Sequence, residues 1–62
     1  MIAHYEPEQQ RETIRNRWGE TIGCFYLRDG YWEFVKDSYR KDPLFTPSEL
    51  AWIEKRQMEL NT

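Results

Sequence analysis

The residues of this chain best suited to acid–base or nucleophilic chemistry are its one histidine and its one cysteine, His4 and Cys24. His4 lies near the amino terminus, where side chains are rarely held in the fixed geometry that general acid–base catalysis requires. Cys24 lies among apolar residues, where a thiol usually packs as a small hydrophobic group. We therefore predict that neither residue is catalytic and that the protein is not an enzyme.

Metal and cofactor chemistry find equally little support in the sequence. One histidine and one cysteine are too few ligands for a structural zinc site. Two carboxylate pairs, Glu8 with Glu12 and Asp37 with Asp42, could in principle act as acid–base pairs. Such spacings are expected by chance in a chain with eleven acidic residues, so we interpret these carboxylates as solvent-exposed charges. The sequence predicts no metal and no cofactor.

A set of basic and aromatic residues could bind nucleic acid, with cations on phosphates and tyrosines stacked on bases. The candidates are Arg11, Arg15, Tyr39, Arg40 and Lys41. Acidic residues stand beside most of them, and the formal net charge of the chain is −2. We keep nucleic-acid binding as the alternative function, because a strong excess of basic residues is typical of such proteins.

Aromatic residues make up 16% of the chain, more than one small core can hold. Tyrosine, tryptophan and arginine are enriched among the residues that dominate protein–protein interfaces. The predicted partner-binding residues are Tyr26, Tyr31, Trp52 and Arg56. The leading prediction is a non-enzymatic binding protein, a steric inhibitor or accessory factor that contacts a larger protein or a second copy of itself. Its size would suit such a protein of a mobile element.

The length of 62 residues predicts a single domain, 1–62, with a small core. No apolar run approaches the roughly 20 residues needed to cross a bilayer, and the first residues lack the basic and then apolar character of a secretory signal. We expect a cytoplasmic protein with no membrane partner and no small-molecule substrate.

The segment 7–18 has the signals of a first helix. Pro7 suits the first turn, and Gly19 follows as a stop. Ile14 and Trp18 are spaced four residues apart, so they would share the buried side of this helix.

The segment 21–36 predicts a β-hairpin. Two runs rich in β-branched and aromatic residues flank Asp29-Gly30, a pair that two-residue turns prefer. Closing the turn there predicts four cross-strand pairs, which are Leu27 with Trp32, Phe25 with Phe34, Tyr26 with Glu33, and Cys24 with Val35.

A second helix is predicted over 47–60. Thr46 is the expected N-cap, Pro47 the first helical residue, and Glu49 the partner of Thr46 in a capping box. Phe45 and Leu50 are spaced to form a hydrophobic staple across this start.

These elements predict an α+β fold in the order helix, strand, strand, helix (α-β-β-α). Both helices would cover one face of the hairpin, and Gly23 on that face would allow a helix to approach closely. The expected core is Ile14, Trp18, Phe25, Leu27, Trp32, Phe34, Phe45, Leu50 and Ile53. The other face would be an exposed apolar patch of Ile22, Cys24, Tyr26, Tyr31 and Val35.

Overall fold

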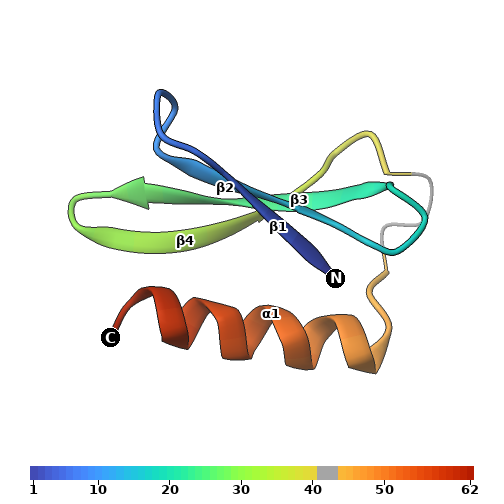
Figure 1. Cartoon of the computed structure of the whole chain (residues 1–62). Coiled ribbons are helices and arrows are strands. Elements are labelled where there is room, and N and C mark those ends of the chain that lie inside the picture. Colours follow the sequence, from blue (N-terminus) through green and yellow to red (C-terminus); the bar gives the residue numbers. More distant parts are fainter. Residues whose placement is uncertain (41–43) are drawn as a thin grey trace.

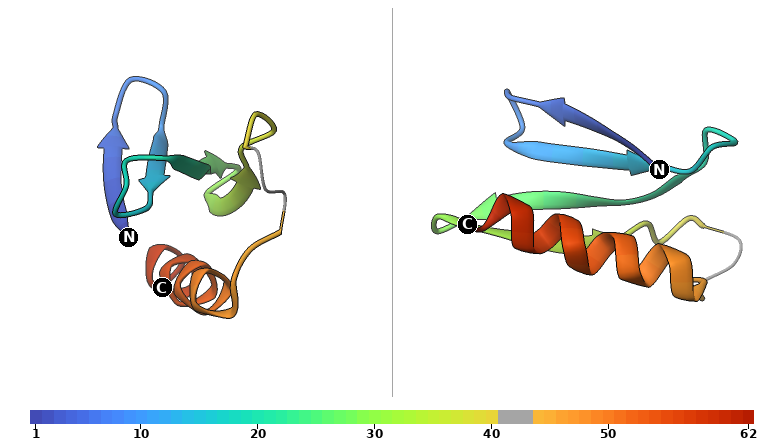
Figure 2. Two further views of the ribbon diagram at one scale, coloured as in Figure 1. Left: turned by 90° about the vertical axis from the view of Figure 1, so that its right-hand side faces the viewer. Right: turned by 60° about the horizontal axis from the view of Figure 1, so that its bottom comes forward.

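The computed structural model describes residues 1–40 and 44–62 as a four-stranded antiparallel sheet followed by one helix (Figure 1). The elements are β1 (Ile2–Glu6), β2 (Arg11–Arg15), β3 (Thr21–Arg28), β4 (Tyr31–Lys36) and α1 (Pro47–Leu60). The strands lie in sequence order, and α1 covers one face of the sheet (Figure 2). The fold is therefore β-β-β-β-α, and the predicted α-β-β-α order is wrong. Among the described residues, no helix is long and apolar enough to cross a membrane.

The predicted first helix, 7–18, is instead the turn and second strand of a β1–β2 hairpin. Pro7 opens this turn, and its carbonyl accepts a hydrogen bond from the Gln10 amide at 3.2 Å. Gln10 has a φ of 50°, a left-handed backbone conformation that helps the chain to reverse direction in this turn. The residues of β2 then alternate between the two sheet faces, with Glu12 and Ile14 buried on the helix side. The helical reading failed because Glu12 is polar and therefore hides this period-2 pattern.

The β3–β4 hairpin is confirmed with its register. All four predicted cross-strand pairs are present, and Arg28 pairs with Tyr31 next to the turn. Asp29 and Gly30 have φ values of 53° and 79°, as expected for the central residues of this kind of two-residue turn. The ring of Phe34 lies over Gly23, where an added Cβ would be 2.4 Å from the ring. A cross-strand phenylalanine, rather than a helix, therefore needs the glycine at this position.

An irregularity in the β2–β3 pairing changes the predicted sheet faces. Ile14 pairs with Gly23 whereas Arg15 pairs with Thr21, so Ile22 is the extra residue of a bulge. The side chain of Ile22 is fully buried and belongs to the core. The prediction that Ile22 lies on an exposed apolar face is wrong.

The core lies between the sheet and α1. Its buried apolar residues are Ile14, Ile22, Phe25 and Ile53, and the residues packed around them are Trp32, Phe34, Phe45, Trp52 and Leu60. Three predicted core residues lie outside this cluster: Trp18 is 76% exposed, Leu50 is 47% exposed, and Leu27 is half-buried. Trp18 lies in the β2–β3 turn, where the Asn16 side chain accepts hydrogen bonds from the amides of Trp18 and Glu20, each at 3.0 Å.

The predicted start of the C-terminal helix is confirmed. The Thr46 hydroxyl accepts from the Glu49 amide at 3.2 Å, and the Glu49 carboxylate accepts from the Thr46 amide at 2.9 Å. Pro47 is the first helical residue. These short-range contacts fix where the helix begins, and two longer-range contacts fix how it lies on the sheet.

The first of these long-range contacts is an ion pair in the core layer. Glu12, only 4% exposed, accepts hydrogen bonds from Arg56 Nε at 2.8 Å and from Arg56 Nη2 at 2.7 Å. The second joins Asn61, which ends α1, to the edge of the sheet. Its side chain accepts from the Trp32 amide at 2.7 Å and donates to the Trp32 carbonyl at 2.9 Å.

Candidate functional site

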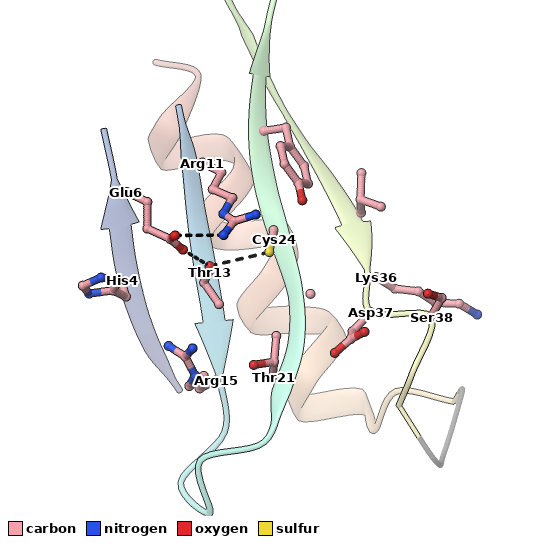
Figure 3. Close-up of a pocket in the computed structure, with 13 residues that line it drawn as sticks. His4, Glu6, Arg11, Thr13, Arg15, Thr21, Cys24, Lys36, Asp37 and Ser38 are labelled. Carbon is pink, nitrogen blue, oxygen red and sulfur yellow. Dashed lines mark hydrogen bonds and ion pairs between the residues drawn. The ribbon is translucent and has the colours of Figure 1, made fainter. Parts of the chain in front are cut away.

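The face of the sheet opposite α1 carries a hollow with a volume of about 650 Å³ (Figure 3). We call this surface the open face. All four strands contribute to it, and so does the segment after β4. Its lining residues are His4, Glu6, Arg11, Thr13, Arg15, Thr21, Gly23, Cys24, Tyr26, Val35, Lys36, Asp37 and Ser38.

A row of hydrogen bonds crosses the open face from β1 to β3 (Figure 3). Arg11 Nη2 donates to Glu6 Oε2 at 2.9 Å, and the Thr13 hydroxyl donates to the other Glu6 oxygen. The Cys24 thiol donates in turn to the Thr13 hydroxyl at 3.7 Å. Because these side chains form hydrogen bonds with one another across neighbouring strands, they are held in place on the surface of the sheet.

The electrostatics of this row oppose a role for Glu6 as a general base. The hydrogen bond from Arg11, together with that from Thr13, lowers the pKa of the Glu6 carboxyl to about 2. The same contact with Glu6 raises the pKa of Arg11 further above its ordinary value. Glu6 is therefore a stable anion at neutral pH and a weak base, which suits binding better than proton transfer.

The open face combines uncharged side chains with charged groups of both signs. Thr13, Cys24, Tyr26 and Val35 line the hollow from β2, β3 and β4. The lining also includes Glu6 and Asp37 as acids and Arg11, Arg15 and Lys36 as bases. Arg15 is exposed, and Figure 3 places it at the β1–β2 side with Lys36 across the sheet. In the part of the chain that is described, no three histidine, cysteine or acidic residues gather so as to hold a metal ion.

The predicted partner-binding residues do not form one surface. Tyr26 lines the open face, and Tyr31, 53% exposed, lies beside the end of α1, where its hydroxyl accepts from Gln57 at 3.2 Å. Trp52 packs against the core, so its predicted place on the polar side of the helix is wrong. Arg56 bonds to Glu12 in the core layer and is held there as a structural residue.

The predicted nucleic-acid residues are also divided. Arg11 and Arg15 share the open face, although Arg11 is bound to Glu6. Arg40 lies at one end of the molecule, where its guanidinium contacts Glu49 at 2.9 Å and Glu20 at 3.5 Å and lies 5.0 Å from the centre of the Phe45 ring. Tyr39, which precedes Arg40 in the sequence, is 93% exposed. Lys41 lies outside the described residues.

Several open-face residues were missed by sequence reasoning, namely His4, Glu6, Thr13, Thr21 and Lys36. His4 was weighed only as a catalytic base, and Thr13 was assigned to a helix. The signal that could have identified them is the alternation of β2, in which Arg11, Thr13 and Arg15 share a face once the segment is read as a strand.

Comparisons of the chain with protein-family models, with curated proteins and with solved structures found no match.

Proposed function

We propose that the protein is a non-enzymatic binding protein and that its open face binds a surface of another protein. The observation that carries this proposal is that α1 covers one face of the sheet, while the other face is hollowed and bears ordered polar side chains. Uncharged side chains beside charged and hydrogen-bonding groups of both signs suit contact with another protein surface. Binding of this kind would act sterically, by occupying part of the partner.

The charges of the open face favour a protein partner over nucleic acid. Glu6 and Asp37 stand among the bases of the hollow and would repel phosphates, whereas a protein surface can offer groups of both signs. The buried guanidinium of Arg40, held by Glu20 and Glu49, removes a further cation from phosphate binding. The complementary surface is therefore one that offers both acidic and basic groups.

The test is affinity capture of the tagged full chain from its host's lysate after nuclease treatment, comparing Arg15→Glu with Lys55→Glu. Arg15 and Lys55 are both exposed, so the two substitutions change the net charge equally, but Arg15 lies on the open face and Lys55 on α1. We expect a stoichiometric protein that is retained by wild type and Lys55→Glu and depleted at least about fivefold by Arg15→Glu, as for loss of roughly 1 kcal/mol at an interface.

Two results would contradict the proposal. Equal retention of the partner by both variants would exclude the open face as the binding surface. Recovery of nucleic acid before nuclease treatment, with an affinity that falls steeply as salt rises, would favour the nucleic-acid function instead.

A further inference from the structure

The two edges of the sheet differ in how their backbone groups are satisfied. The Leu27 amide donates to the Gln10 carbonyl at 3.1 Å, which makes these residues a hydrogen-bonded pair between β2 and β3. Because hydrogen-bonded and non-bonded pairs alternate along an antiparallel ladder, the register then directs the backbone groups of Ile2, His4 and Glu6 toward β2. The amides and carbonyls of Ala3 and Tyr5 consequently point out of the sheet.

The opposite edge, β4, is covered at the equivalent position. By the same alternation Trp32 directs its amide and carbonyl outward, and both groups are bonded by the side chain of Asn61. The Asn61 side-chain amide thus forms the two hydrogen bonds to β4 that a neighbouring strand would otherwise form. Among the described residues, β1 pairs with β2 alone and has no such cover. Edge strands of this kind are templates for pairing with another strand.

We propose that β1 pairs with β1 of a second copy of this chain, antiparallel and about a two-fold axis at His4. Ala3 of one copy then forms a hydrogen-bonded pair with Tyr5 of the other, and the reverse pair follows by symmetry. A small side chain thereby lies opposite a large one on the helix side of the sheet. Ile2 and Tyr5, which are 61% and 52% exposed, would gain cover from the second copy.

The charges of β1 and the position of Pro7 favour this register over registers shifted by one residue. Centred on His4, it places each Glu6 opposite Ile2 and diagonal to the imidazole of the other copy, so no two carboxylates face each other. Shifting the centre to Tyr5 would set Ala3 opposite Pro7, which has no amide hydrogen to donate. The His4-centred register therefore uses all the outward backbone groups of Ala3 and Tyr5.

This pairing adds to the proposed binding function rather than following from it. Two four-stranded sheets would join edge to edge, and their open faces would become neighbours in one continuous surface. A strand of five residues buries little area, so we expect a weak dimer with a dissociation constant on the order of 1–100 µM.

The first test is sedimentation analysis over a range of protein concentration, comparing Ala3→Pro with Lys36→Pro. Each substitution removes one outward amide hydrogen, from β1 and from β4 respectively, and leaves the inward ladder bonds in place. We expect Ala3→Pro to raise the dimer dissociation constant at least tenfold and Lys36→Pro to leave it unchanged. A wild-type chain that stays monomeric at about 1 mM, or a dimer lost only in Lys36→Pro, would overturn the proposal.

The second test checks the register and does not depend on either proline variant folding. In a Cys24→Ser background, His4→Cys should oxidise to a covalent dimer, because the two copies' residues at this position would face each other as a non-bonded pair. Ile2→Cys is the matched control on the same strand and should remain largely monomeric. Equal crosslinking of both variants, or of neither, would contradict the His4-centred pairing. Partner capture on the open face could succeed or fail independently of these results.

Discussion

A carboxylate on the core side of a sheet needs a partner, because removing a charge from water costs several kcal/mol unless another group compensates it. Glu12 has that partner in Arg56, which lies 44 residues later in the chain and binds both carboxylate oxygens. The contact raises the pKa of Arg56 above its ordinary value, chiefly through the hydrogen bond to Glu12. The pair therefore links β2 to α1 by a charge interaction within the core layer.

We expect Glu12→Ala to lower the free energy of unfolding by about 1.5–3 kcal/mol, because it removes both charge-assisted hydrogen bonds from Arg56. Urea denaturation followed by circular dichroism measures this change. Glu59→Ala is the matched control, since Glu59 also contacts Arg56, at 3.5 Å, but is half exposed and should cost less than about 1 kcal/mol. If Glu12→Ala proves so unstable that it is unfolded in buffer, the double variant Glu12→Leu/Arg56→Met should restore folding. Similar losses in the two single variants would contradict the assigned role.

The pKa of Glu6 predicts a dependence of stability on acid pH. Its folded value of about 2 lies below the ordinary value of 4.5, so the folded state favours the ionised form. This contribution is complete above pH 4.5 and is lost as the pH falls from 4.5 to 2. We expect Glu6→Gln to flatten the wild-type curve of unfolding free energy over that range. Arg11→Met should flatten it as well, because Arg11 is the main cause of the lowered pKa; parallel curves for wild type and both variants would refute the assignment.

At the scale of elements, the parts predicted correctly are those specified by neighbouring residues. Asp29-Gly30 defines the β3–β4 turn and its register, and Thr46 with Glu49 defines the start of α1. The segment 7–18 was mistaken for a helix because Pro7 and Gly19 resemble helix boundaries. Its strand pattern depends on Glu12 being buried, and that burial depends on Arg56, which no local pattern reveals.

Asn61 is the corresponding contact at the end of α1, and its loss should separate the helix from the β4 edge. It exchanges two hydrogen bonds with the backbone of Trp32 and donates a third, at 3.0 Å, to the Gln57 carbonyl. We expect Asn61→Ala to lower the free energy of unfolding by about 1–2 kcal/mol, since the half-buried Trp32 amide loses its acceptor while the Trp32 carbonyl keeps only the longer bond from Gln57, at 3.4 Å. Thermal denaturation measures the loss. Thr62→Ala, which removes an exposed hydrogen bond to Glu59, should change stability by less than about 0.5 kcal/mol.

At the scale of the whole molecule, one helix against four strands leaves a sheet face without a covering layer. The sequence predicted that one sheet face would remain exposed. It also predicted, on other grounds, that three residues of the hollow are functional: Tyr26 as an anchor, and Arg11 and Arg15 as basic contacts. It did not predict that this face would be polar. The β-bulge places the side chain of Ile22 in the core instead of on this face. Strands β1 and β2 place the charged side chains of Glu6, Arg11 and Arg15 on this face, whereas the predicted fold had no strand in that part of the chain.

The measurement that tests the central claim most directly is amide chemical-shift mapping of the isotope-labelled chain with its captured partner. If the open face is the binding surface, the largest changes will fall on residues that line its hollow, such as Thr13, Cys24 and Val35. Changes concentrated instead on the exposed side of α1, at Glu54, Lys55 and Met58, with the open face unperturbed, would contradict the claim.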